Sequence, residues 1–154
     1  MIKLLLAIFL GKLYAGSTTI TYDDVGNSKY IAVTTYKLFA RKDKETYDYA
    51  KPKWTGVGTV VNNIKTIRTN GYQSNQTYCF VLRAHYTTNN LDSPNSNEMC
   101  VKIPKLTPPS GFKLVNFDTR IGWNNKTASI VVLYMNIESG ETVTEEIQEE
   151  LHQI

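Results

Sequence analysis

Two neighbouring stretches decide the fold: Asn75-Gln-Thr-Tyr-Cys-Phe-Val-Leu-Arg-Ala-His85 and Ser96-Asn-Glu-Met-Cys-Val-Lys-Ile103. In the first stretch apolar side chains occupy every second position, which is the period of a strand with one buried face. The second stretch continues this alternation, and the segment between the two is polar and rich in turn-forming residues. The pattern therefore predicts an antiparallel hairpin.

The pairing of the two cysteines follows from this hairpin. If Ser93 lies opposite Tyr86, then Cys100 lies opposite Cys79. Directly opposed residues on antiparallel strands have Cα atoms about 4.5 to 5.5 Å apart, a separation that a disulfide can bridge. Both sulfurs would lie on the outer face of the sheet, away from Tyr78. The alternative is two free thiols in a cytosolic protein.

The same hairpin resembles the last two strands of a fibronectin type III domain. Upstream, residues 67–78 are similar to the preceding strand and corner of that family, and residues 34–39 and 20–24 are similar to its third and second strands. The resemblance implies an all-β antiparallel sandwich. It also implies that Tyr78 is a corner tyrosine whose hydroxyl bonds to upstream backbone, and that Tyr22 stands where the family usually has a core tryptophan.

Composition and charge favour one principal domain. The chain has 154 residues with 42% hydrophobic content, and it contains ten tyrosines and few helix-type runs, which favours the all-β class. All 17 Lys and Arg residues lie at or before Lys126, whereas from Glu138 onward there are six acidic residues and no basic one. This division favours contact with a charged protein neighbour. Because the basic residues are scattered, we expect no nucleic-acid binding.

The N-terminal segment admits two interpretations. Residues 1–10 combine one lysine with an apolar run, and Ala15 is a small residue at which a signal peptidase could cut. The run is too short to cross a bilayer, so we expect no integral membrane span. A cleaved signal peptide over residues 1–15 is the preferred interpretation, and an uncleaved first β-strand is the alternative. If the segment is removed, the first strand of the sandwich is missing or is supplied from elsewhere.

Aromatic residues interleaved with lysines form the candidate binding site. Exposed aromatic rings beside cations are a common way for β-sandwich modules to hold sugars or peptides. Tyr47, Tyr49 and Trp54 are therefore predicted to contact a protein partner or a cell-surface glycan. The alternative places Trp54 against an edge of the core, in compensation for the tryptophan that is missing at Tyr22.

A Pro-rich linker at residues 105–111 separates a sandwich over residues 16–104 from an extension over residues 112–154. Two β-favouring runs, at residues 112–117 and 128–137, predict a strand pair in the extension. Two strands alone are marginal in water. They must pack on the sandwich, complete it, or add to another chain, and we favour addition to another chain.

The final residues are predicted to form a short amphipathic helix. Residues 142–145 resemble a capping box, and apolar residues spaced for one helical face accompany it. A helix of about 12 residues is marginal unless this apolar stripe docks on a partner or on its own domain. The stripe is the candidate assembly tail: Val143, Ile147, Leu151 and Ile154. A chain truncated after Lys105 is then predicted to be a soluble monomer that no longer joins its complex.

The sequence gives no support for catalysis. Neither His85 nor His152 lies in a recognisable nucleophile–base arrangement, and the chain has no glycine-rich phosphate loop, zinc signature or GxSxG motif. We predict no catalytic residue, no metal and no cofactor. The favoured function is a structural component of a bacteriophage virion, such as a decoration, neck or fibre protein, because the chain resembles short fibronectin-like phage proteins. The alternative is a secreted bacterial adhesion or carbohydrate-binding module.

Overall fold

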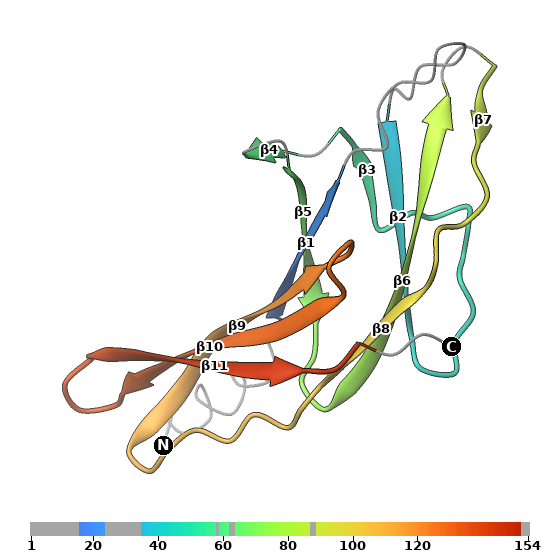
Figure 1. Ribbon diagram of the computed structural model, residues 1–154. Coiled ribbons are helices and arrows are strands. Elements are labelled where there is room, and N and C mark those ends of the chain that lie inside the picture. The colour runs from blue at the N-terminus through green and yellow to red at the C-terminus, as the bar shows by residue number, and fades with distance from the viewer. Residues whose placement is uncertain (1–15, 24–34, 58, 62–63, 87–88, 152–154) are drawn as a thin grey trace.

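The computed structural model describes residues 16–23, 35–57, 59–61, 64–86 and 89–151, and these residues form strands and turns but no helix. Two sheets face one another in a sandwich-like arrangement (Figure 1). The predicted signal segment at residues 1–15 lies outside the described residues. The strands are β1 (Gly16–Asp23), β2 (Thr35–Lys42), β3 (Trp54–Gly56), β4 (Thr59–Val61), β5 (Ile64–Tyr72), β6 (Gln76–Tyr86), β7 (Leu91–Asp92), β8 (Met99–Ile103), β9 (Phe112–Gly122), β10 (Thr127–Asn136) and β11 (Thr142–Glu149).

The first sheet is built around the predicted hairpin. Its order is β3-β2-β6-β7, and β8 also pairs with β6. The predicted opposition of Cys79 and Cys100 is confirmed. Its premise is wrong, because Leu91 rather than Ser93 lies opposite Tyr86. The register shifts between β7 and β8, where the returning strand leaves the regular ladder.

Two serines hold the hairpin together across this irregular segment. The backbone N–H groups of Ser93 and Ser96 donate to the carbonyls of Ala84 and Leu82 at 2.8 and 2.9 Å. The serine hydroxyls accept the return bonds from the N–H groups of the same two residues, at 2.9 and 2.8 Å. Pro94, which has no N–H to offer, lies between the serines. Serine oxygens thus replace ladder carbonyls and keep β6 hydrogen-bonded until β8 begins.

The second sheet has the order β11-β10-β9-β1-β5-β4. β1 lies in its interior, antiparallel to β5 on one side and parallel to β9 on the other. At the start of the parallel pairing the hydroxyls of Ser17 and Thr19 donate to the carboxylate of Asp118 at 2.8 and 2.9 Å. Both edges of β1 are therefore occupied.

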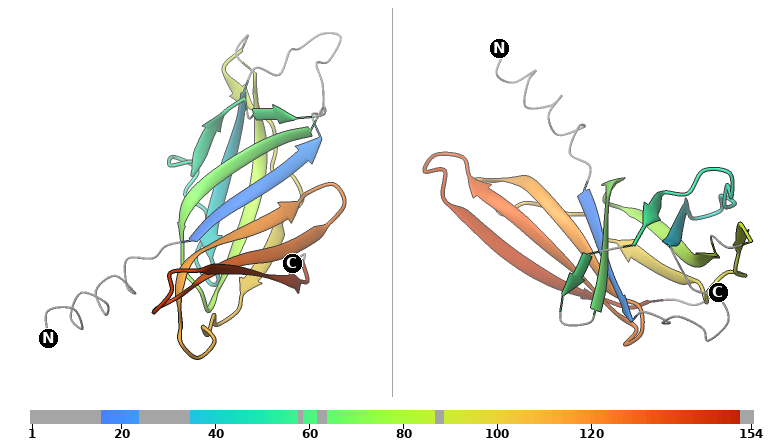
Figure 2. Two further views of the ribbon diagram at one scale, coloured as in Figure 1. Left: turned by 90° about the vertical axis from the view of Figure 1, so that its left-hand side faces the viewer. Right: turned by 90° about the horizontal axis from the view of Figure 1, so that it is seen from above.

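The C-terminal strands complete the sheet of their own chain. β9 pairs with β1, and β10 pairs with β9 and β11, so that these strands widen the sheet away from β1, as Figure 2 shows. Of the three arrangements that the sequence leaves open, the structure shows completion of the sandwich by the chain's own C-terminal strands. The physical reason is burial, because most inward side chains of β9 and β10 are apolar and almost completely buried, among them Phe117, Ile121, Ile130 and Val132.

The predicted C-terminal helix is wrong, because Thr142–Glu149 forms strand β11. A tight turn precedes this strand. The side chain of Asn136 accepts the backbone N–H groups of Glu138 and Ser139 at 3.0 and 3.1 Å, and Gly140 has a φ of 76°, in the left-handed region that glycine tolerates. The turn returns the chain antiparallel to β10 and covers an edge that would otherwise be open.

The predicted assembly stripe is accordingly divided. Val143 and Ile147 lie on β11 opposite Tyr134 and Ile130, where Ile147 packs against the core and Val143 is 44% exposed. Leu151 lies beyond the strand and also packs against the core. Ile154 falls outside the described residues. The four residues therefore do not form one helical docking face.

The core lies between the sheets and draws on both parts of the chain. Trp123, which follows β9, is 6% exposed, and its indole N–H donates to the side chain of Asn97 at 3.2 Å. Trp54 is only partly buried against the core. The core side chains are Ile20, Tyr22, Tyr36, Leu38, Ile67, Tyr72, Tyr78, Phe80, Leu82, Ala84, Met99, Val101, Ile103, Phe117, Ile121, Trp123, Ala128, Ile130, Val132 and Tyr134.

Candidate interaction surfaces

Tyr47 and Tyr49 lie on the loop between β2 and β3 and cover the outer face of the first sheet. The ring of Tyr49 packs edge-on against Phe39, with centroids 5.1 Å apart, and the guanidinium of Arg83 lies 3.9 Å above the Tyr49 ring. Beneath this layer lies a small apolar cluster, separate from the main core: Phe39, Cys79, Val81 and Cys100. The two tyrosines therefore shield apolar surface of their own chain.

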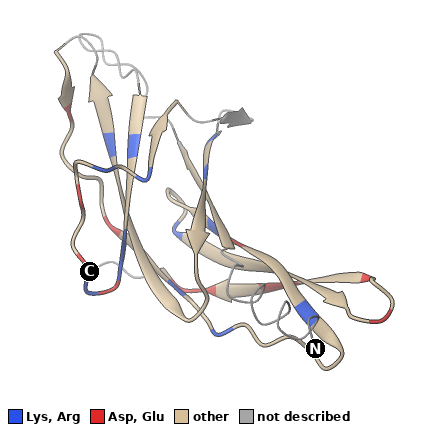
Figure 3. Ribbon diagram, turned by 180° about the vertical axis from the view of Figure 1, so that it is seen from behind, with Lys and Arg blue, Asp and Glu red and all other residues tan. Residues whose placement is uncertain are grey.

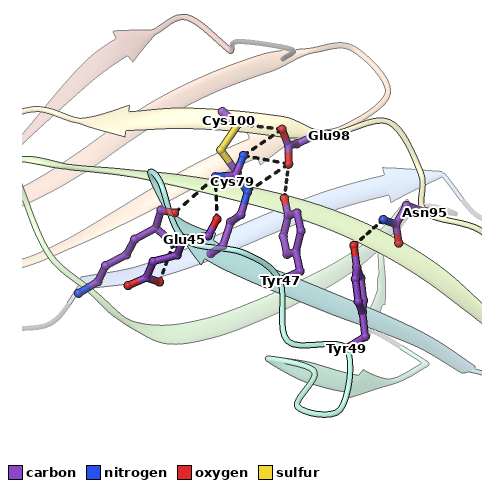
Figure 4. A network of polar contacts seen from close by, with 9 residues as sticks. Glu45, Tyr47, Tyr49, Cys79, Asn95, Glu98 and Cys100 are labelled. Atoms are coloured by element: carbon purple, nitrogen blue, oxygen red, sulfur yellow. Dashed lines mark hydrogen bonds and ion pairs between the residues drawn. A yellow bond between two sulfur atoms is a disulfide. The ribbon is translucent and has the colours of Figure 1, made fainter.

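Hydrogen bonds fix both tyrosines in place (Figure 4). The hydroxyl of Tyr47 donates to Oε2 of Glu98 at 2.6 Å, and the amide of Asn95 donates to the hydroxyl of Tyr49 at 2.8 Å. Nη2 of Arg41 donates to the same Glu98 oxygen at 3.2 Å. Burial raises the pKa of Tyr47, and the Glu98 carboxylate raises it further. The phenol therefore remains protonated, and donates to Glu98, throughout the neutral range.

The structure brings two of the three predicted binding residues together and separates the third. The rings of Tyr47 and Tyr49 have centroids 5.9 Å apart. Trp54 lies opposite Leu38, whose side chain faces the core, so Trp54 belongs to the other face of the first sheet. Its ring lies over Gly56, where a Cβ atom would come within 2.8 Å. The three residues therefore do not form one aromatic platform.

The predicted disulfide between Cys79 and Cys100 is present, with the two Cα atoms 4.1 Å apart. It lies on the outer face of the first sheet, as the sequence indicates, but it is buried rather than exposed. Oε1 of Glu98 lies 3.6 Å from the Cys100 sulfur, so the three side chains are close enough to hold a metal ion. Both sulfurs are committed to the disulfide, which leaves one carboxylate as a ligand. Such bonds are typical of oxidising compartments.

His85 belongs to an ion-pair cluster that joins three strands of the first sheet. Its Nδ1 lies 2.6 Å from Oδ1 of Asp92, and Nζ of Lys37 lies 3.1 Å from the other oxygen of the same carboxylate. Burial alone would raise the pKa of Asp92, but hydrogen bonds from His85 and Lys37 lower it overall. The cluster links β2, β6 and β7 through one carboxylate.

Replacement of this carboxylate should weaken the acid sensitivity of the fold. Because the folded pKa of Asp92 is depressed, its stabilising effect is present above the unfolded pKa of about 3.9 and is lost as the pH falls through the folded pKa. Urea unfolding at about pH 6 and about pH 3 should therefore differ by less in Asp92→Asn than in the wild type, by up to about 1 kcal/mol for this partly exposed cluster. An equal pH difference in both proteins would contradict the assignment.

A pocket of about 400 Å³ opens at one end of the sandwich. Its floor includes the rings of Tyr22, Tyr36 and Trp123, and its rim includes the amides of Asn95 and Asn97. The lining contains no Lys, Arg, Asp or Glu side chain of the described chain. The pocket lies beside the ends of β1 and β2 that residues 24–34, outside the described part, connect.

The remaining surface is the edge of the second sheet at β11. One side of β11 pairs with β10 along its whole length, from Glu149 opposite Ala128 to Thr142 opposite Met135. In the described part of the chain no strand pairs with its other side. Sequence reasoning missed this edge, although Asn136 followed by Ser139-Gly140 is a hairpin signal that could have indicated it.

One hydrogen bond shows which way the backbone N–H and C=O groups of each β11 residue point. The N–H of Asn136 donates to the carbonyl of Glu141 at 2.8 Å, in the same register as the strand pair. Hydrogen-bonded and non-hydrogen-bonded pairs alternate in an antiparallel ladder. The backbone groups of residues 143, 145, 147 and 149 therefore point toward β10. Those of residues 142, 144, 146 and 148 point away from it and toward a possible neighbour.

Acidic residues gather along this strand and its turn, as the red segments of the ribbon in Figure 3 show. Five of the six are exposed, and Glu149 is half-buried. Each carboxylate adds charge near the open backbone groups, so the edge combines strand-pairing capacity with negative potential. The six are Glu138, Glu141, Glu145, Glu146, Glu149 and Glu150.

Comparison with known proteins provides no relative from which a function could be transferred. No family model, no curated protein and no solved structure matches the chain significantly. The described residues contain no helix long and apolar enough to cross a membrane.

Proposed function

We propose that this chain is a non-catalytic, fibronectin type III-like module that assembles with other protein subunits through the β11 edge. The observation that carries this proposal is the open side of an eight-residue strand in the second sheet. Outward N–H and C=O groups on such an edge can accept a strand from a partner, with affinity from main-chain hydrogen bonds. Proteins that do not pair through an exposed edge strand usually keep that strand short or cover it.

Contacts in the corner before β6 support the fibronectin type III-like part of the proposal. The hydroxyl of Tyr78 accepts the backbone N–H of Gln73 at 2.8 Å, the kind of contact that the resemblance implies for a corner tyrosine. The Tyr78 ring also packs edge-on against Tyr72, with centroids 4.9 Å apart. β9 takes the place of a first strand beside β1, so the C-terminal part both completes the sandwich and presents β11.

The assembly that we propose for this module is a virion, in which it would act as a decoration, neck or fibre protein. Particles of this kind are built from many repeated subunit contacts, which a small sandwich with an open strand edge can supply. Disulfides persist on virion and cell surfaces. The Cys79–Cys100 disulfide is therefore compatible with a protein that lies on the outside of a virion.

A secreted adhesion module is the second candidate. It is favoured by the disulfide, which is typical of oxidising compartments. For glycan binding, the exposed part of Tyr49 beside Arg83 is the contact that this candidate would use. Glycan binding by a stable monomer would favour it over the virion component.

The variant Thr144→Pro tests whether β11 is the assembly edge. Proline removes an N–H that points away from β10, and proline is tolerated on an edge strand in that position. We expect the variant to fold with nearly unchanged thermal stability but to remain free when the wild-type full chain enters its native particle. Velocity sedimentation of the purified particles, followed by mass spectrometry of their subunits, measures incorporation.

Val143→Pro is the matched control, because the N–H at that position points toward β10. It should destabilise the fold by up to about 3 kcal/mol through the loss of a ladder bond. A well-folded Thr144→Pro chain that enters the particle as efficiently as the wild type would rule out strand addition at β11.

A further inference from the structure

We infer that the β11 edge of one copy binds the opposite edge of the same sheet in a second copy, so that copies associate head to tail. This inference rests on the proposed function and names the partner for the β11 edge. The second sheet has two ends, β11 at one and β5 with the short strand β4 at the other. Each end offers backbone pairing to the other.

The far edge has room for a strand. β4 pairs with β5 only at residues 64–66. Along residues 67–72 no strand of the described chain covers that side of β5. The regular part of this stretch, residues 67–70, ends at the register shift before Tyr72 and spans about 14 Å at about 3.4 Å per residue, which is about half the length of β11.

Charge complementarity favours this pairing over other pairings of the edges. β11 and the segments that flank it carry six carboxylates, three of them on the strand itself, whereas the open part of β5 carries Arg68, and Nζ of Lys53 lies 5.0 Å from the centroid of the Tyr72 ring at the end of β5. A symmetric pairing of β11 with β11 would place like charges against each other, which is destabilising. The acidic edge and the basic edge attract one another instead.

Strand direction and side-chain faces are also compatible. Within one chain β11 runs antiparallel to β5, so two copies related by a simple head-to-tail shift bring these strands together antiparallel. With Thr144 opposite Asn70, Glu146 lies opposite Arg68. In the sheet register both side chains belong to the outer face, in line with Ser17 and Thr19 of β1. The register shift between Gly16 and Ser17 of β1 leaves Tyr72, whose ring lies in the core, outside this regular pairing. The pairing stops where β4 begins to cover β5.

Sedimentation velocity of the purified full chain, from about 1 to 200 μM, tests the inference. A head-to-tail contact does not close on itself at two copies, so the average mass should rise with concentration beyond that of a dimer. Salt should weaken the association because it screens charge pairs. Glu146→Arg and Arg68→Glu should each raise the dissociation constant about tenfold or more, and the double variant should recover most of the loss.

Glu138→Arg is the control for net charge, since it makes the same charge change in the turn outside the pairing strand. Its effect should be much smaller than that of Glu146→Arg. Circular dichroism checks each fold, and because Glu146 is exposed, Glu146→Arg alone decides the outcome if Arg68→Glu fails to fold.

Two outcomes would overturn the inference. A mass that stops at two copies would indicate a symmetric dimer, and a chain that stays monomeric at every concentration would show that the carboxylates protect the edge from pairing. A different result would contradict the proposed function itself, namely a folded Thr144→Pro chain that still enters the native particle. A monomeric chain whose Thr144→Pro variant is excluded from the particle would retain the proposed function with a different partner.

Discussion

Truncation after Lys105 is expected to abolish the folded state, rather than to leave the soluble monomer that the sequence alone predicts. The truncation removes β9, β10 and β11, and with them large core side chains such as Phe117, Trp123 and Tyr134. Loss of one buried aromatic side chain typically costs about 3 to 5 kcal/mol. Because a whole domain is stable by only about 5 to 15 kcal/mol, the combined loss exceeds what the remaining sandwich can provide. β1 would also lose the partner along one edge.

Circular dichroism in the near-ultraviolet range and thermal unfolding of the chain ending at Lys105 measure this effect. We expect no cooperative transition and no fixed aromatic signal. A chain ending at Ser139 is the matched control, because it removes β11 but keeps β9 and β10, and β11 supplies only partly buried or exposed side chains. The control should unfold cooperatively at a reduced temperature. A cooperative fold in the shorter chain would show that the C-terminal strands are an appendage.

The hairpin of the first sheet could be predicted from sequence because its signals are local. The alternation around Phe80 and the polar turn specify the two strands, and Cys79 and Cys100 are found opposite one another. The shift in strand pairing near Tyr86 could not be predicted. Serine hydroxyls replace backbone carbonyls as hydrogen-bond acceptors there, and this replacement leaves no trace in the hydrophobic periodicity. A correct pairing was thus reached from a wrong starting register.

The C-terminal part could not be predicted as well, for two physical reasons. The spacing of Val143, Ile147 and Leu151 is four residues, which fits one face of a helix and equally fits one face of a strand. The pairing of β9 with β1 joins residues about a hundred positions apart, as between Thr19 and Arg120. Local sequence carries no information on such a partner, so its own chain and a second chain were equally compatible.

For the candidate binding tyrosines, the local sequence likewise does not determine whether the side chains are exposed. Tyr47 and Tyr49 are in a polar loop, and composition alone makes them resemble an exposed aromatic site. Their packing depends on Phe39 and Val81, which form an apolar patch on the face of the sheet opposite the core. A strand with both faces buried appears in sequence as a continuous apolar run. Beside the alternation that continues to His85, the segment Tyr78-Cys-Phe-Val-Leu82 is apolar at every position, which could have indicated that its outer face is also covered.

Removal of the disulfide has the second largest expected effect. We expect the free energy of unfolding of the double variant Cys79→Ala/Cys100→Ala to be lower than that of the wild type by about 3 kcal/mol. The disulfide closes a loop of 21 residues and so constrains the unfolded chain. For a chain of this size the midpoint of thermal unfolding should fall by about 6 to 12 °C. Urea unfolding of both proteins under non-reducing conditions gives the difference directly.

Reduction of the wild type provides the control for this variant. Because both sulfurs are buried beneath Glu98 and its partners, reductant should act slowly on the folded protein and quickly once urea unfolds it. Reduced wild type should then approach the stability of the double variant, and reductant should not affect the variant. Equal stabilities of oxidised wild type and variant, with an intact mass that shows free thiols, would contradict the bond. A disulfide together with a mass that begins near Gly16 would instead indicate export and would favour the secreted candidate.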